Sequence, residues 1–211
     1  MSRTRVKICG ITTPADAEHA AAAGADAIGL VFYPGSARSI EPEQAAAIVA
    51  ALPPFVTPVA LFLDAAGEQI AAVLERVRVG MLQFHGSEAV SFCRSFGRPY
   101  IKTVGMADTT DPATVATAYP DAAGLLTDSH GSGCAGGTGH SFAWDRLPAR
   151  RDYGLILAGG LTPDNVAAAV TTVRPDAVDV STGVERAPGR KDAARIQRFI
   201  EEVRRGDRNE T

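Results

Sequence analysis

The sequence predicts a single-domain α/β protein, a (β/α)8 TIM barrel, from three observations. Eight short runs rich in Val, Ile, Leu and Phe recur along its 211 residues. Ala-rich stretches with apolar residues at helical spacing separate these runs, which is the alternation typical of a parallel sheet. Successive runs begin about 20 to 32 residues apart, which leaves no room for an inserted domain. A doubly wound open sheet usually has fewer strands and a fingerprint loop after the first, so the barrel is the better prediction.

The strands are expected in runs of four to six residues that are rich in Val, Ile, Leu and Phe. These runs are Arg5–Cys9, Ala27–Phe32, Val59–Leu63, Gly80–Phe84, Tyr100–Val104, Gly124–Thr127, Gly154–Ala158 and Ala177–Ser181. Several of the intervening helices open with proline near the first turn, where its missing N–H costs nothing. The expected helices are Pro14–Ala23, Pro42–Leu52, Gly67–Val77, Ser87–Phe96, Pro112–Ala118, Pro163–Thr172 and Lys191–Arg205.

Two stretches of the chain need separate treatment. Ala45–Leu63 holds nineteen residues without a charge, about the length that spans a bilayer. Its prolines at 53, 54 and 58 instead predict a helix end, a turn and a buried strand, so we expect no membrane partner. The barrel domain is expected to cover residues 1–205, and residues 206–211 are expected to form a disordered, charged tail.

Composition narrows the class of protein and its compartment. Twenty-one Lys and Arg against 24 Asp and Glu give a net charge of −3, which disfavours a nucleic-acid partner. Cys9, Cys93 and Cys134 are too few for a disulfide framework, so a reducing cytoplasm is expected. The first residues carry no apolar stretch of signal-peptide length. The oligomeric state stays open.

Two glycine-containing turns after the last two strands predict a phosphate site. Gly159 and Gly160 follow the seventh strand, and Ser181, Thr182 and Gly183 follow the eighth. Such turns expose backbone N–H groups, and phosphate commonly binds there in barrels, at the face where active sites lie. The alternative is that these glycines only make tight turns. The expected partner is therefore a small phosphorylated substrate.

Cys9 and Asp128 end the first and sixth strands and are candidates for a base and an acid in one cavity. Cys9 could equally be inert packing, and Asp128 could cap the next loop. Arg38 lies where the second strand leads into the barrel mouth, and its guanidinium suits a carboxylate or phosphate, although an exposed, solvated arginine is the alternative. Lys7 and His85 are expected to neighbour the site.

The segment after the sixth strand contains patterns that do not carry their usual chemistry. Gly131–Gly136 matches GxGxxG, but no helix is expected to open there. The phosphate-binding lysine of a P-loop is replaced by Gly137. His130, Cys134 and His140 lack zinc-site spacing and a fourth ligand, so no metal is expected. The segment is interpreted as a mobile active-site flap.

Six segments in this order resemble the phosphoribosylanthranilate isomerases of tryptophan biosynthesis, over about Val6 to Phe199. They are VKICGIT from Val6, GLVFYPGSAR from Gly29, LQFHGSE from Leu82, LLTDS from Leu125 with GGTGHSFAW after it, LAGGLTPDNV from Leu157, and VDVSTGVE from Val178.

The resemblance implies an aldose–ketose isomerase that performs an Amadori rearrangement by general acid–base catalysis, with no cofactor and no metal. The substrate would be N-(5-phospho-β-D-ribosyl)anthranilate and the product 1-(2-carboxyphenylamino)-1-deoxy-D-ribulose 5-phosphate. Asp128 would be the general acid and Cys9 the general base. Arg38 would hold the anthranilate carboxylate, and the two glycine-containing turns would surround the phosphate.

Three positions depart from the family pattern. Ala143 and His140 stand where Asp and Lys are frequent in the flap, and Asp64 stands where Asn is frequent. The first two departures bear on how the flap is anchored, and Asp64 bears on the polar contacts at the end of the third strand. Two alternative functions are compatible with such a barrel. One is a related sugar-phosphate isomerase of the histidine pathway, or one serving both pathways, and the other is a barrel that binds phosphate without turnover. The histidine-pathway alternative requires paired aspartates and a second Gly-Gly turn, which this sequence lacks.

Overall fold

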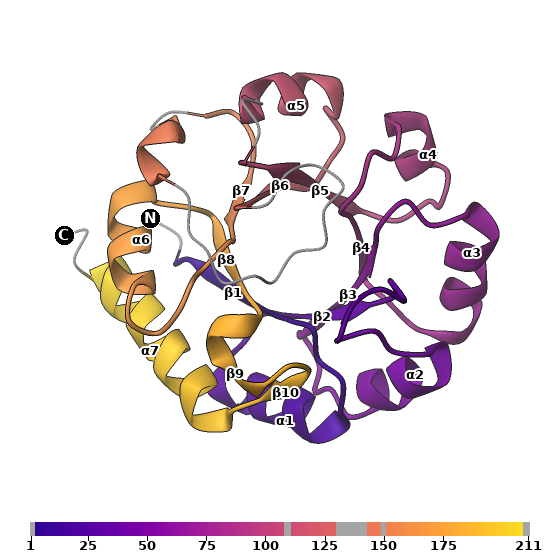
Figure 1. The fold of residues 1–211 in the computed structure, drawn as a ribbon, viewed down its shortest axis with the longest axis horizontal. Helices are drawn as coiled ribbons and strands as arrows, with labels where there is room; N and C mark the ends of the chain where they lie inside the picture. Colours follow the sequence, from indigo (N-terminus) through magenta and orange to yellow (C-terminus); the bar gives the residue numbers. More distant parts are fainter. Residues whose placement is uncertain (1–2, 108–110, 130–142, 149–150, 209–211) are drawn as a thin grey trace.

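A computed structural model of the chain describes residues 3–107, 111–129, 143–148 and 151–208. Eight parallel strands close into a barrel in sequence order, with β8 paired to β1, and the helices form a ring around it (Figure 1). The predicted single barrel is therefore confirmed. The strands are β1 (Arg5–Cys9), β2 (Ala27–Val31), β3 (Thr57–Phe62), β4 (Met81–Phe84), β5 (Tyr100–Gly105), β6 (Gly124–Asp128), β7 (Leu155–Leu157) and β8 (Ala177–Val180).

Seven helices, two 3-10 turns and a small hairpin make up the rest of the described elements. The helices are α1 (Pro14–Ala23), α2 (Pro42–Ala50), α3 (Gly67–Arg76), α4 (Val90–Arg94), α5 (Pro112–Ala118), α6 (Val166–Val173) and α7 (Ala193–Arg208), with single 3-10 turns η1 (Trp144–Arg146) and η2 (Thr182–Val184). Strands β9 (Glu185–Ala187) and β10 (Arg190–Lys191) form an antiparallel hairpin between β8 and α7. No described helix is long and apolar enough to cross a membrane.

Alternation along the strands separates the outer core from the barrel interior. Outward-facing residues such as Ile8, Phe62 and Leu125 pack with the helices in one large buried cluster. A second cluster, built on Val59, Ile101, Leu126 and Ala158, fills the lower part of the interior. Polar side chains replace apolar ones at the carboxyl ends of the strands, and there the interior opens.

The predicted C-terminal boundary was wrong. Residues 206–208 were expected in a disordered tail, but α7 continues to Arg208. Gly206 is buried against α6, where a Cβ would meet Val170 at 2.9 Å. The Asp207 carboxylate accepts hydrogen bonds from the backbone N–H (3.2 Å) and the hydroxyl (2.7 Å) of Thr4. These contacts join the end of α7 to Thr4, the residue just before β1.

Three helix starts lie later than predicted, each for a local reason. Lys191 belongs to the hairpin, so α7 begins at Ala193. The Glu88 carboxylate accepts from the backbone of Asp64 (2.9 Å) and Gly86 (3.0 Å), which keeps its segment in a turn before α4. Asn165 closes another turn before α6, because its side chain accepts from Thr162 N–H at 2.8 Å.

Candidate active site

The mouth of the barrel contains two adjoining cavities that share three lining residues, Asp128, Asp179 and Ser181. The larger, about 520 Å³, lies between the loops after β7 and β8. The smaller, about 70 Å³, is lined by Cys9, Arg38 and His85 as well. Nine of the ten site residues predicted from the sequence line these two cavities, and Lys7 is the exception.

The loops after β7 and β8 touch each other and form the wall of the larger cavity. Gly159 and Gly160 have φ of +84° and +65°, which side chains rarely adopt. Gly183 packs directly on the carbonyl of Leu161, where a Cβ would overlap it. Among the hydrogen bonds of the described residues, the N–H groups of Gly160 and Gly183 have no acceptor. Such N–H groups are typical of anion sites.

The Asn165 side chain fixes the shape of the β7 loop. It donates to the carbonyl of Gly160 at 2.9 Å while accepting from Thr162. The first residue of α6, Val166, therefore lies three positions beyond the Pro163 start expected from the sequence. An ordered turn, instead of a helix N-terminus, therefore lines this side of the larger cavity.

Cys9 is buried at the carboxyl end of β1, and its side chain faces the smaller cavity. Lys7, two positions earlier on the same face, forms a buried ion pair with Asp179 of β8, with Nζ and Oδ1 2.8 Å apart. Both side chains pass over Gly29, where a Cβ would lie 2.7 Å from Sγ and 3.1 Å from Nζ. Burial raises the pKa of the Cys9 thiol, while the Lys7 ammonium opposes that increase.

Asp128 faces His85 across the mouth. The His85 Nε2 lies 3.8 Å from Oδ2 of Asp128, and its Nδ1 lies 3.3 Å from the Thr103 hydroxyl. Burial lowers the pKa of His85 despite the nearby carboxylate, so the imidazole is neutral at neutral pH. A neutral imidazole beside Asp128 can exchange a hydrogen bond with the carboxyl in either protonation state.

Arg38 is held by hydrogen bonds to Glu185 and Thr182. Its Nε and Nη2 donate to the two carboxylate oxygens of Glu185 at 2.8 and 2.7 Å, and Nη2 also donates to the Thr182 hydroxyl at 3.1 Å. Gly10, with φ +73°, leaves the space through which the Arg38 side chain passes. The Glu185 hydrogen bonds raise the pKa of Arg38, so it stays cationic.

The sequence did not point to several buried polar residues around the mouth. Among them are Gln83, Asp179, Glu185 and Lys191. An Asp inside the apolar β8 run, at the same spacing from Ser181 as Lys7 from Cys9, was a usable signal, because a charge on a strand's inner face needs a partner. Glu185 and Lys191 gave no comparable signal, since each lies in a short hairpin with ordinary surface composition.

The departures at the third strand have a clear structural outcome. Asp64 adopts φ +47°, and its Oδ1 accepts from Ser87 N–H at 2.7 Å. The polar contact that Asn would make is therefore present with Asp. Ala143 begins the turn before η1. His140, the zinc candidates His130 and Cys134, and most of the predicted flap lie outside the described residues.

The fold and the mouth define a (β/α)8 barrel enzyme for a phosphorylated small molecule. A family model described as N-(5'phosphoribosyl)anthranilate (PRA) isomerase matches residues 6–202. The N-(5'-phosphoribosyl)anthranilate isomerase of Alcanivorax borkumensis is 55% identical over 211 residues, with 97% of each chain covered. That of Pseudomonas fluorescens is 52% identical, covering 98% of this chain and 99% of its own. The chain belongs to the N-(5'-phosphoribosyl)anthranilate isomerase family.

Solved structures of this family have the same architecture. The phosphoribosyl anthranilate isomerase of Thermotoga maritima is 40% identical, with a TM-score of 0.83 over 95% of this chain and 98% of that one. A second structure, of an isomerase in complex with reduced 1-(o-carboxyphenylamino)-1-deoxyribulose 5-phosphate, is 39% identical with a TM-score of 0.80 over the same shares.

Proposed function

We propose that this protein catalyses the Amadori rearrangement of N-(5-phospho-β-D-ribosyl)anthranilate to 1-(2-carboxyphenylamino)-1-deoxy-D-ribulose 5-phosphate in tryptophan biosynthesis. One observation carries the proposal: Cys9 and Asp128 line a single small cavity, with Arg38 on its wall and the two glycine-containing loops beside it. The reaction needs an acid, a base and groups that hold the substrate in place, and these residues supply all three.

The first step opens the furanose ring. Protonated Asp128 gives its proton to the ring oxygen, the bond between that oxygen and C1 breaks, and the nitrogen lone pair forms a protonated Schiff base with C1. His85, 3.8 Å from the carboxyl, stays neutral and orients it. The positive iminium makes the neighbouring C2–H acidic, so the second step can follow in the same cavity.

The second step removes the C2 proton. The Cys9 thiolate takes it, the C2–H electrons form the C1–C2 double bond of an enolamine, and the iminium is neutralised. Tautomerisation then gives the 2-ketone. Because burial raises the pKa of Cys9, the thiolate depends on nearby positive charge, which Lys7 supplies permanently and the iminium supplies during the step.

Both ends of the substrate would be held. The phosphate would lie against Gly159, Gly160, Ser181, Thr182 and Gly183, all of which line the larger cavity. The anthranilate carboxylate would bind Arg38. Fixing both ends places C2 against Cys9 without a metal or cofactor.

We propose that this enzyme acts in the cytoplasm. Cys9 and Cys93 are buried free thiols in the described part of the chain, and a base that must act as a thiolate requires a reducing compartment. The oligomeric state is not part of the proposal.

The test is turnover of phosphoribosylanthranilate by the purified protein after EDTA treatment, with Cys9→Ala and Asp128→Asn variants. Each variant should lose about 10²- to 10⁴-fold in kcat, because each removes one proton-transfer group. Cys93→Ala is the matched control, since Cys93 is a buried thiol in α4. Activity that survives both substitutions in folded protein contradicts the acid–base assignment. An unmodified protein that binds the product but never turns over would support the non-catalytic alternative.

A further inference from the structure

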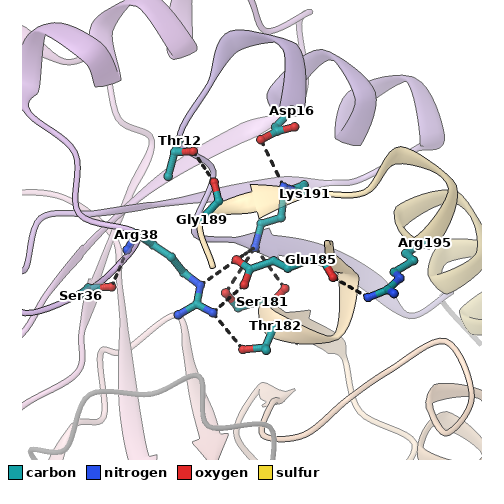
Figure 2. A network of polar contacts seen from close by, with 10 residues as sticks. All are labelled: Thr12, Asp16, Ser36, Arg38, Ser181, Thr182, Glu185, Gly189, Lys191 and Arg195. Atoms are coloured by element: carbon teal, nitrogen blue, oxygen red, sulfur yellow. Dashed lines mark hydrogen bonds and ion pairs between the residues drawn. The ribbon is translucent and has the colours of Figure 1, made fainter. Parts of the chain in front are cut away.

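Glu185 lies buried between two cations at the mouth of the barrel. Its carboxylate accepts from Arg38 at 2.8 and 2.7 Å, and Oε1 also accepts from the Lys191 ammonium at 2.8 Å (Figure 2). The side chains of Glu185 and Lys191 are 3% and 0% exposed. Burial disfavours the charged carboxylate, but the two cations outweigh it and lower the pKa of Glu185. The anion is therefore permanent at neutral pH.

The contacts with Glu185 and Thr182 determine which N–H groups of the Arg38 guanidinium remain available to a ligand. A guanidinium has five N–H donors. Glu185 takes one from Nε and one from Nη2, and the Thr182 hydroxyl takes the second from Nη2. Within the described residues, the two N–H groups of Nη1 have no acceptor, and Arg38 lines the smaller cavity. A carboxylate entering that cavity thus meets an arginine already oriented.

Lys191 connects the same cluster to the phosphate side of the site. Besides Glu185, its ammonium donates to the Ser181 carbonyl at 3.1 Å and lies 3.4 Å from the Ser181 hydroxyl. Ser181 borders both cavities. Arg38, Lys191 and Glu185 carry two positive charges and one negative, so the cluster has one positive charge in excess. A bound carboxylate would neutralise it.

The hairpin β9–β10 supplies two of the three charged residues of this cluster, Glu185 and Lys191. Glu185 begins β9 and Lys191 ends β10, and the turn between them is tied to the first βα loop because Thr12 donates to the Gly189 carbonyl at 2.6 Å. Arg195 of α7 donates to the Glu185 carbonyl. A buried ion cluster is weak evidence for stability alone, since desolvation offsets much of its attraction. Because Arg38 of this cluster lines the smaller cavity, the cluster is placed to act on a bound ligand.

We propose that Glu185, supported by Lys191, is a positioning residue that orients Arg38 for the carboxylate of the substrate, so that the protein selects ligands carrying both a phosphate and a carboxylate. This inference rests on the proposed function, because it assumes that Arg38 meets the carboxylate. Glu185 touches no part of the substrate; it acts through Arg38.

The test compares two ligands on wild-type protein and Glu185→Gln by calorimetric binding. One is reduced 1-(o-carboxyphenylamino)-1-deoxyribulose 5-phosphate, and the other is the same compound without the ring carboxylate. Glu185→Gln should weaken the carboxylated ligand about tenfold and the other less than twofold, so the selectivity between them collapses. In turnover, KM should rise about tenfold while kcat changes less than twofold. Equal weakening of both ligands, or no change in either, overturns the proposal.

Three further variants separate positioning from folding. Glu202→Gln, at a partly exposed glutamate of α7 that pairs with Arg205, is the matched control and should change neither affinity. In an Arg38→Ala background, Glu185→Gln should add no further loss for the carboxylated ligand. Glu185→Asp keeps the charge and should restore part of the selectivity, which also covers the case in which Glu185→Gln does not fold. A wild-type protein that binds neither ligand would refute the proposed function itself and is distinct from these outcomes.

Discussion

At the residue scale, the chemistry of the candidate base depends on charges deeper in the barrel. Cys9 is surrounded by apolar residues, including Val31 and Leu61, which disfavour a thiolate. Lys7 is the largest influence that favours it, and Asp179 both pairs with Lys7 and opposes the thiolate. The ion pair of β1 and β8 therefore sets how readily Cys9 loses its proton.

Replacing Lys7 should move the pH dependence of kcat/KM. Activity that needs the Cys9 thiolate rises as pH passes the pKa of Cys9, so a higher pKa moves that rising limb to higher pH. Lys7→Met removes the favourable charge and should shift the limb by about one to three pH units. Lys7→Met with Asp179→Asn should shift it less, in the same direction, because the opposing charge is removed too.

Lys102→Met is the control for the loss of a buried ammonium. Lys102 forms an equally buried pair with Glu88 at 2.9 Å, and its ammonium lies 5.7 Å from the centre of the Tyr119 ring of the α5 region. This variant should lose stability yet leave the limb in place. A limb that moves equally in both lysine variants would show that destabilisation, and not charge near Cys9, is responsible.

At the element scale, helices α6 and α7 come into close contact at Gly206. A Cβ on Gly206 would lie 2.9 Å from Val170 Cβ and 3.0 Å from the Ala167 carbonyl. Glycine usually weakens a helix by about 1 kcal/mol relative to alanine. Here it allows the two helices to approach each other, so α7 continues through Gly206 despite that cost.

Gly206→Ala should therefore destabilise the protein by about 1–3 kcal/mol, because the methyl group overpacks the α6–α7 contact. Gly67→Ala is the matched comparison at the first residue of α3, where a Cβ meets Phe92 at an ordinary 3.7 Å. That variant should be neutral or more stable by up to about 1 kcal/mol. Urea unfolding measures both, and a gain in stability from Gly206→Ala would refute the close contact.

At the scale of the whole molecule, the sequence predicts what is local and misses what joins distant segments. The eight strands and most helices follow from periodicity within each segment, and glycines after β7 and β8 mark their loops without help from the rest of the chain. Lys7 and Asp179 are 172 positions apart, and Arg38 and Glu185 are 147 apart. No periodicity encodes such pairs, so the clusters that tune Cys9 and orient Arg38 emerge only when the barrel closes.

The same closure joins the two ends of the described chain, because Thr4 donates to Asp207 from both its backbone N–H and its hydroxyl, 203 positions away. Asp207→Ala should lower the free energy of unfolding by about 1–3 kcal/mol, since Thr4 is buried and would keep unsatisfied donors. Asp207→Asn retains one carbonyl oxygen and should lose less. Both contacts lie at the amino end of β1, opposite the mouth, so kcat and KM should stay at wild-type values in folded protein. Urea unfolding and turnover measured on the same preparations test this separation between the face that stabilises the barrel and the face that carries the site. A variant that retains full stability but loses turnover would show that the two faces are coupled.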